Sequence, residues 1–151
     1  MIFIITLDNF SLNNVSLLEK KKNIIMDGTF TKINYLSEWY TMNGLCLYAS
    51  LDVKYIYDNS IKFDPKTINN TNIIKQLSNI EKQLLILYSN YYQCDFTLNN
   101  LLSKQLHYGS LKISSDCKNN ANNIYIIKIS GIWQSNNEIG IIYKTIKSSI
   151  I

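Results

Sequence analysis

The stretch "IYIIKISGIWQSNNEIGIIYKTI" (residues 124–146) consists of two apolar runs separated by Asn136 and Asn137. Both runs are rich in β-branched and aromatic residues, which favour strands, and Asn is a frequent turn residue. The stretch therefore predicts a closing β-hairpin. Gly131 lies inside the first run, two residues before Trp133. A glycine there relieves a bend or allows a close approach, so we interpret it as a bend in a coiled strand, with a ligand contact as the alternative.

Earlier segments predict a meander of antiparallel strands. The Asp-Gly pair at 27–28 is a strong hairpin signal, and the Asn-Gly pair at 43–44 is a second one. A corner is expected at Ser37 and Glu38. From residue 45 onward, the even spacing of Leu45, Leu47, Ala49 and Leu51 places them on one face of a strand. The other expected strands are 2–7, 23–26 and 29–36, with an irregular polar connection at 8–22.

The middle of the chain changes to helical spacing. Apolar residues recur at three- and four-residue steps from Ile73 to Tyr91, which predicts an amphipathic helix over 71–91, with N-caps available at 70–72. A shorter helix is expected at 98–107, capped by Thr97 and followed by Gly109. A short strand at 110–114 and a loop at 115–123 then lead to the hairpin.

The order of strands, helices and strands predicts one α+β domain over residues 1–151. The single Pro and five Gly offer no linker. We expect a mostly antiparallel small barrel or curled sheet, with the OB type among the alternatives, together with one long amphipathic helix and a shorter second helix.

The charge of the chain limits the ligands it can bind. The net charge is +4 and all 15 basic residues are Lys, with no Arg. This charge permits contact with a polyanion, but a duplex-binding protein usually has a denser basic stripe. Without Arg, guanine edges cannot be read by a bidentate guanidinium. We therefore do not expect sequence-specific duplex recognition.

Cys46, Cys94 and Cys117 are odd in number and match no metal spacing, which predicts free thiols in a reducing compartment. The opening run to Asp8 lacks a basic region and is too short for a signal peptide or membrane span. We predict an intracellular protein without metal, cofactor or membrane attachment.

Three stretches, "MDGTFTKINY" (26–35), "YTMNGLCLY" (40–48) and "KISGIWQSNNEIGIIYK" (128–144), resemble small uncharacterised proteins of large nucleocytoplasmic, mimivirus-like DNA viruses. The resemblance implies a viral origin and a place in the host cytoplasm, the viral factory or the virion. It carries no site residues with it.

Lysines and aromatic residues alternate along the expected strands, and this pattern is typical of surfaces that bind single-stranded nucleic acid without sequence choice. We therefore predict a non-enzymatic protein that binds such a strand through one sheet face. Trp39, Tyr40 and Tyr143 belong to the same pattern. The predicted binding residues are Lys32, Tyr35, Lys54, Tyr55, Tyr57, Lys128, Trp133 and Lys144.

Two other classes of function stay open. Asp27, Asp52 and Lys54 match the skeleton of a Mg²⁺-dependent nuclease, although Asp27 is also explained by the hairpin turn. His107, the single histidine, lies at a predicted helix end. We expect it to interact favourably with the helix dipole there and not to take part in catalysis. Alternatively, exposed Tyr and Trp mark a viral structural or host-interaction module, whose partner is a viral or host protein or a second copy of the chain. The isoleucines of "IKSSII" (146–151) either pair as a last strand segment or dock on such a partner.

Overall fold

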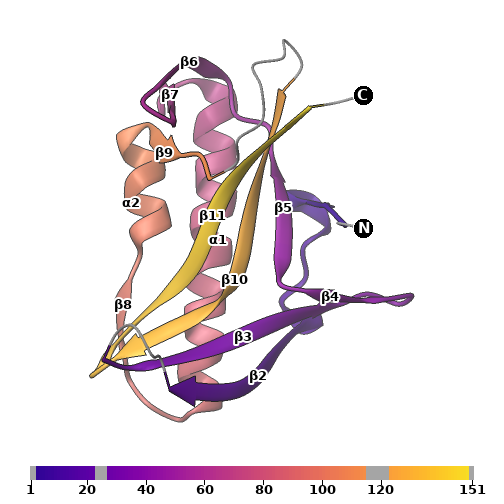
Figure 1. Cartoon of the computed structure of the whole chain (residues 1–151), viewed down its shortest axis with the longest axis vertical. Coiled ribbons are helices and arrows are strands. Elements are labelled where there is room, and N and C mark those ends of the chain that lie inside the picture. The colour runs from indigo at the N-terminus through magenta and orange to yellow at the C-terminus, as the bar shows by residue number, and fades with distance from the viewer. Residues whose placement is uncertain (1–2, 23–26, 115–122, 150–151) are drawn as a thin grey trace.

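A computed structural model describes residues 3–22, 27–114 and 123–149 of the chain. The protein has an α+β fold with mostly antiparallel strands and two helices, as predicted. Figure 1 shows the longer helix α1 (Ile68–Tyr91) running behind the two long strands β10 (Asn123–Ser135) and β11 (Glu138–Ser149). The helices thus cover one face of the large sheet.

The hairpin of β10 and β11 is the centre of the large sheet. Its predicted turn is confirmed, with Asn136 in the left-handed region at φ 54°. One edge of β10 pairs with β11, and its other edge pairs first with β5 and then with β3. The remaining strands of this sheet are β1 (Ile5–Thr6), β2 (Val15–Lys22), β3 (Thr29–Leu36), β4 (Thr41–Asn43), β5 (Leu45–Ala49) and β8 (Thr97–Asn99).

A small antiparallel sheet lies at one end of α1, with the strand order β6-β7-β9. The second helix, α2 (Leu101–Tyr108), leads directly into β9. Two single turns of 3-10 helix, η1 and η2, connect β1 to β2. The bounds are β6 (Val53–Tyr57), β7 (Ser60–Phe63), β9 (Ser110–Lys112), η1 (Leu7–Asn9) and η2 (Leu12–Asn14).

Neither sheet closes into a barrel in the described part of the chain. The main path of the large sheet runs from β1 to β8 without returning to its start, while β2 and β4 branch off through β3. A small barrel, the OB type included, is therefore not confirmed, and the prediction is confirmed at the level of an α+β fold with mostly antiparallel sheets and two helices.

Both helices form close to where the periodicity places them. The helix α1 begins three residues earlier than predicted, because the Thr67 side chain accepts a hydrogen bond from the Asn70 backbone N–H and caps it. Residues 97–99 form a strand instead of the first turn of the second helix, so α2 starts at Leu101. As predicted, Gly109 ends α2 in the left-handed conformation, at φ 89°.

The polar connection expected at 8–22 is a wrong prediction over residues 15–22, which form β2 and pair with β3. The strand lies at the edge of the sheet, where water can solvate a run of lysines. Its lysine-rich sequence therefore hid the strand. The strand expected at 23–26 lies outside the described residues.

The hairpin predicted at Asn43 and Gly44 is also wrong, because β4 and β5 do not pair with each other. At Gly44 the chain instead passes from β4, which pairs with β3, to β5, which pairs with β10. The Gly44 φ of +86° suits glycine, and its N–H donates to the Ile33 carbonyl at 3.0 Å. Leu45, Leu47 and Ala49 then point together into the core, as their spacing predicts.

A buried carboxylate joins the two helices. The Glu81 side chain on α1 is fully buried, and its two oxygens accept hydrogen bonds from the backbone N–H groups of Leu102 and Ser103, each at 3.0 Å. These groups are free donors at the start of α2, so Glu81 caps that helix from a neighbouring element. Burial raises the pKa of Glu81, and the two backbone hydrogen bonds oppose that rise.

A lysine holds the β2–β3 hairpin against the end of α1. The Lys20 ammonium lies 3.7 Å from the centre of the Tyr92 ring and donates to Gln134 Oε1 at 3.0 Å. Tyr88 donates to the same oxygen at 2.7 Å. This cation–π contact and shared acceptor bring β2, β10 and α1 together.

Candidate nucleic-acid interface

The large sheet has one face toward the helices and one away from them, which we call the outer face. On β3, Ile33 faces the core at 1% exposure, so Phe30 and Lys32 face outward. The register continues this face across the neighbouring strands. The outer face, as used below, carries Lys21 on β2, Phe30 and Lys32 on β3, Cys46 on β5, Lys128 and Trp133 on β10, and Gly140, Ile142 and Lys144 on β11.

A bulge in β10 brings Lys128 and Trp133 to the same face. In a regular strand, residues five apart point to opposite faces. The register with β11 shifts between Ile129 and Gly131, so that one extra residue separates the two side chains. The predicted bend at Gly131 is thus a bulge, and its effect is to aim Trp133 outward.

Two aromatic rings lie across glycines on this face. A Cβ atom on Gly131 would come within 2.8 Å of the Phe30 ring, and one on Gly140 would come within 2.6 Å of the Trp133 indole. Both rings therefore occupy space that a side chain would otherwise fill. Phe30 and Trp133 are directly paired across β3 and β10, and both are partly exposed. The pair forms a low aromatic platform on the open sheet.

Lysines surround this platform. Lys128 on β10 lies opposite Lys144 on β11 and opposite Cys46 on β5, and Lys21 on β2 lies opposite Phe30. Burial raises the pKa of the Cys46 thiol, and the positive charges of Lys128 and Lys144 partly oppose this shift. The outer face thus combines ammonium groups and rings within a few strands.

The surface beside Phe30 and Lys32 is hollowed on two sides. A hollow of about 170 Å³ is bordered by these residues, Lys128 and Ser130. A second hollow of about 200 Å³ lies toward β2, bordered by Lys21 and by the exposed carboxylate Glu19. Shallow hollows between rings and ammonium groups suit bases and phosphates of a flexible strand.

Four of the eight predicted binding residues, Lys32, Lys128, Trp133 and Lys144, therefore lie together on the outer face. Three others, Lys54, Tyr55 and Tyr57, lie on the small sheet, where the two tyrosines are 59% and 70% exposed. Sequence reasoning missed Phe30 and Lys21. The two-residue spacing of Phe30 and Lys32 was the signal that could have identified Phe30.

The prediction of Tyr35 as a binding residue is wrong. Its side chain is 3% exposed and points into the core, and its hydroxyl accepts hydrogen bonds from the Ser11 N–H and from Asn14. Because Lys32 and Tyr35 are three residues apart on one strand, they face opposite sides. Tyr143 also faces inward and donates to Gln105, and burial together with the Glu81 charge raises its pKa to about 12.

The other exposed tryptophan lies away from the outer face. Trp39 is 83% exposed in the turn between β3 and β4, next to Tyr40, whose ring stacks on Phe3 at 3.8 Å between centres. Figure 1 shows this hairpin projecting from the body of the molecule. Trp39 therefore belongs to a separate surface.

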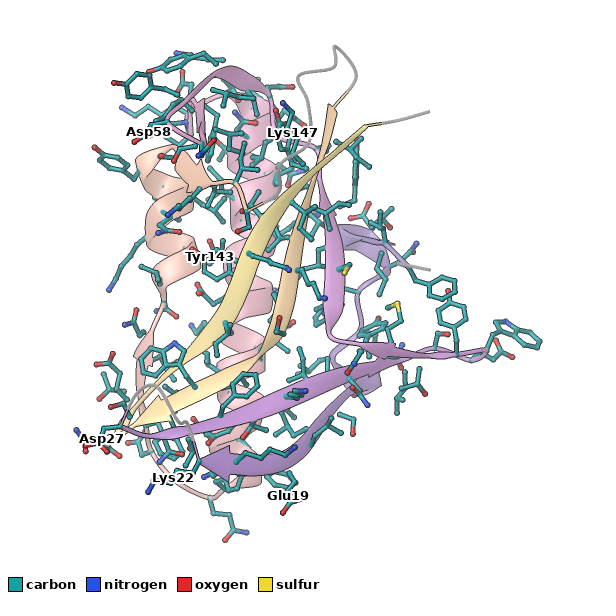
Figure 2. All side chains as sticks on the ribbon, viewed as in Figure 1. Glu19, Lys22, Asp27, Asp58, Tyr143 and Lys147 are labelled. Atoms are coloured by element: carbon teal, nitrogen blue, oxygen red, sulfur yellow. The ribbon has the colours of Figure 1, made fainter. Side chains whose placement is uncertain are left out.

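The two carboxylates of the nuclease hypothesis lie near opposite ends of α1. Asp52 precedes β6, and its N–H donates to Asn70 in the first turn of α1. Asp27 lies at the far end of the molecule from the β6–β7 turn, which Asp58 marks in Figure 2. Gly28, next to Asp27, lies against the Gln134 backbone, and the Gln134 side chain accepts a hydrogen bond from Tyr88. Asn70 and Tyr88 are 18 residues apart on α1, which separates them by about 27 Å along the helix axis. The structure does not bring the two carboxylates together around one metal ion.

No three His, Cys, Asp or Glu side chains within the described residues are grouped so as to hold a metal ion. His107 is exposed in the last turn of α2, where its Nδ1 lies 2.7 Å from the Ser103 carbonyl oxygen. Cys46 and Cys94 are free thiols, while Cys117 lies outside the described residues.

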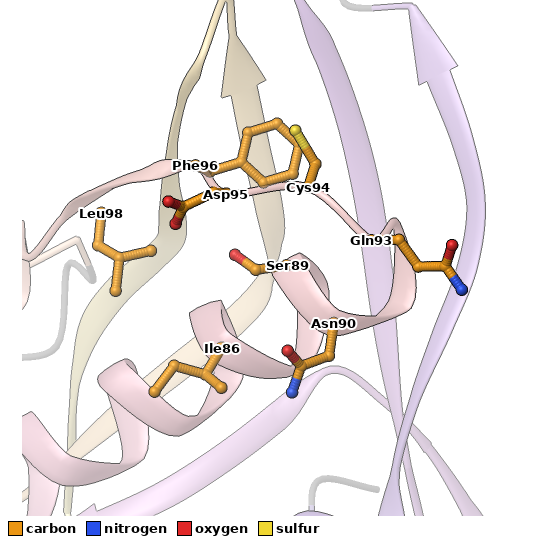
Figure 3. A pocket seen from close by; sticks show the side chains of 8 residues that line it. All are labelled: Ile86, Ser89, Asn90, Gln93, Cys94, Asp95, Phe96 and Leu98. Carbon is orange, nitrogen blue, oxygen red and sulfur yellow. The ribbon is translucent and has the colours of Figure 1, made fainter.

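A hollow of about 610 Å³ lies between the end of α1 and the segment leading to β8 (Figure 3). Figure 3 shows Ser89 and Asn90 on the last turn of α1, Gln93 just after the helix end, and the Asp95 carboxylate on the segment that follows. Among the described residues that line it, Asp95 is the one with a charged side chain. This hollow therefore offers less to a charged ligand than the outer face does.

Comparison of the chain with protein-family models, curated proteins and solved structures finds no match. The viral resemblance of the three stretches consequently stays a prediction. In the part of the chain that the structure describes, neither helix is both long and apolar enough to cross a membrane.

Proposed function

We propose that the protein binds single-stranded nucleic acid, without sequence choice, on the outer face of its large sheet. The observation that carries the proposal is the gathering of Lys32, Lys128 and Lys144 around the rings of Phe30 and Trp133, on a face that neither helix covers.

The chemistry of these side chains fits such a ligand. A base that stacks on an exposed ring contributes about 1 to 3 kcal/mol, whatever its identity. Lysine ammonium groups neutralise phosphates as point charges and do not read base edges in a fixed geometry. Rings and lysines without arginine therefore favour affinity without sequence preference. The proposal includes an intracellular protein of viral origin, which the resemblance of residues 26–35, 40–48 and 128–144 supports.

The two tryptophans of the chain allow a direct test. In Trp39→Ala, Trp133 is the single indole, so its fluorescence reports on the outer face alone. Adding an oligothymidylate should quench this fluorescence, because a base stacks on the indole. Trp133→Ala should weaken binding by about 5- to 150-fold, the equivalent of one lost stack.

Trp39→Ala also serves as the matched control for affinity. Trp39 is the more exposed of the two indoles. If binding depended only on the exposure of an aromatic ring, the loss of Trp39 would lower the affinity more than the loss of Trp133. We expect wild-type affinity in this variant. Equal losses in both variants, or no binding by the wild type, would count against the proposal.

A viral structural or host-interaction module is the second candidate. The exposed Trp39 at the tip of the β3–β4 hairpin favours it, because a projecting indole supplies contact area to a protein partner. Co-purification of a protein, or self-association in solution, that Trp39→Ala abolishes would support this function. Retention of the same complex in the variant would oppose it.

A further inference from the structure

The small sheet has an outward face of its own, with the same chemistry as the outer face. Ile61 and Leu111 point into the core at 0% and 1% exposure. Their neighbours on β7 and β9 therefore point outward. Two cross-strand rows result: Tyr55, Lys62 and Ser110 form one, and Tyr57, Ser60 and Lys112 form the other.

One of these lysines is held in place. The Lys62 ammonium donates to Ser110 Oγ at 2.8 Å, within the row that begins with Tyr55. A fixed ammonium group beside an exposed phenol ring repeats the combination of charge and ring found around Trp133. In the β6–β7 hairpin (53–63) the acidic residue is Asp58, which lies in the turn between the two strands.

Within the described residues, an isolated bridge joins the two sheets. Ile113, which follows β9, pairs in parallel with Thr145 on β11, and the Ser114 N–H donates to the Thr145 carbonyl at 2.9 Å. Thr145 is buried and Ile113 packs against the core. The residues before them, Lys112 and Lys144, therefore both point outward on adjacent strands. The two outward faces are continuous at this bridge.

We propose that one nucleic-acid strand occupies both sheets, passing from the outer face over Lys144 and Lys112 to Lys62, Tyr57 and Tyr55. This inference rests on the proposed function. The occupant is anionic and rich in flat groups, because the extension offers ammonium groups and exposed rings. Bases stack on the tyrosines and phosphates lie on the lysines.

The surface sets the length of the ligand. From β3 to β6 the path crosses β10, β11, β9 and β7, which makes five strand spacings of about 4.8 Å, or about 24 Å in total. At about 3.4 Å per stacked nucleotide this corresponds to about seven nucleotides. A strand of about four nucleotides is therefore too short to reach across both sheets, and one of about twelve is more than long enough.

The test compares the wild type with Tyr57→Ala in their affinity for fluorescent oligothymidylates of about four and about twelve nucleotides. The longer strand should bind the wild type as one strand per chain. Tyr57→Ala should weaken its binding by about 5- to 150-fold. Tyr91→Ala, which removes a ring of 64% exposure from the end of α1, is the matched control and should bind like the wild type.

The outcomes separate this inference from the proposed function. If Trp133→Ala weakens binding of the longer strand but Tyr57→Ala and Lys112→Gln do not, the extension is overturned and the outer face alone is the site. If neither strand binds the wild type, the proposed function itself fails. Because Tyr57 and Lys112 are exposed, their loss leaves the core intact.

Discussion

The number of lysines on the outer face predicts how steeply binding falls with salt. Lys21, Lys32, Lys128 and Lys144 provide four ammonium groups for phosphates. For a single strand, the logarithm of the binding constant falls with that of the salt concentration with a slope of about −0.7 per phosphate neutralised. Four contacts give a slope of about −2.8, which is a loss of about 50-fold between about 50 and 200 mM salt.

Replacing Lys128 and Lys144 by Gln should halve this dependence. The slope becomes about −1.4, and the same change in salt then costs about 7-fold. The assay is the anisotropy of a 5′-phosphorylated oligothymidylate of about four nucleotides, which carries about four phosphates and which one sheet accommodates, across a salt series. Glutamine keeps much of the side-chain length, so the change removes charge and little packing.

The matched control removes two lysines from the helical side. Lys75 and Lys82 are exposed on α1, and their replacement by Gln lowers the net charge by the same amount. We expect this variant to keep the wild-type slope. If both double variants lower the slope equally, then net charge and not the outer face governs binding, and the reasoning is refuted.

Three further predictions concern the fold that supports this face. Burial raises the pKa of Glu81, so the stabilisation from this shift is fully present below the ordinary carboxyl pKa and is lost as pH rises through the raised value. Urea unfolding from pH 4 to 7 should show this loss of stability in the wild type and not in Glu81→Gln. Equal pH profiles of the two proteins would contradict the prediction. Gly140→Ala should displace the indole of Trp133, since the new Cβ would lie 2.6 Å from it, with a shift in fluorescence maximum and weaker oligonucleotide binding; an unchanged spectrum would show that the ring does not rest on this glycine. Lys20→Met should lower the free energy of unfolding by about 0.5 to 2 kcal/mol through loss of the contact with Tyr92, and unaltered urea unfolding would argue against that contact.

Periodicity alone predicted much of the fold. The run from Ile73 to Tyr91 predicted α1, because apolar residues at three- and four-residue steps over such a length fit few structures other than an amphipathic helix. The closing hairpin followed from two β-branched runs around Asn136. The strand β2 was missed because an edge strand needs only one buried face and tolerates lysines on the other.

The candidate site was harder to predict because it depends on which face each strand turns outward. Strict alternation along β3 places Lys32 and Tyr35 on opposite faces, and it would have identified Phe30 as the aromatic residue on the same face as Lys32. The same count misplaces Trp133 relative to Lys128, because Gly131 indicates a bend but not the extra residue that the bulge inserts. The bridge that joins the two sheets pairs residues 32 positions apart, and nothing local in the sequence indicates it.

The most direct measurement is the map of backbone amide chemical shifts as an oligothymidylate is added to isotope-labelled protein. The largest changes should fall on the outward residues of β3, β10 and β11, around Lys32, Trp133 and Lys144, while the exposed side of α1 stays unchanged. Changes concentrated on α1 and α2, or no changes at concentrations that saturate other single-strand-binding proteins, would contradict the assignment of this face as the binding surface.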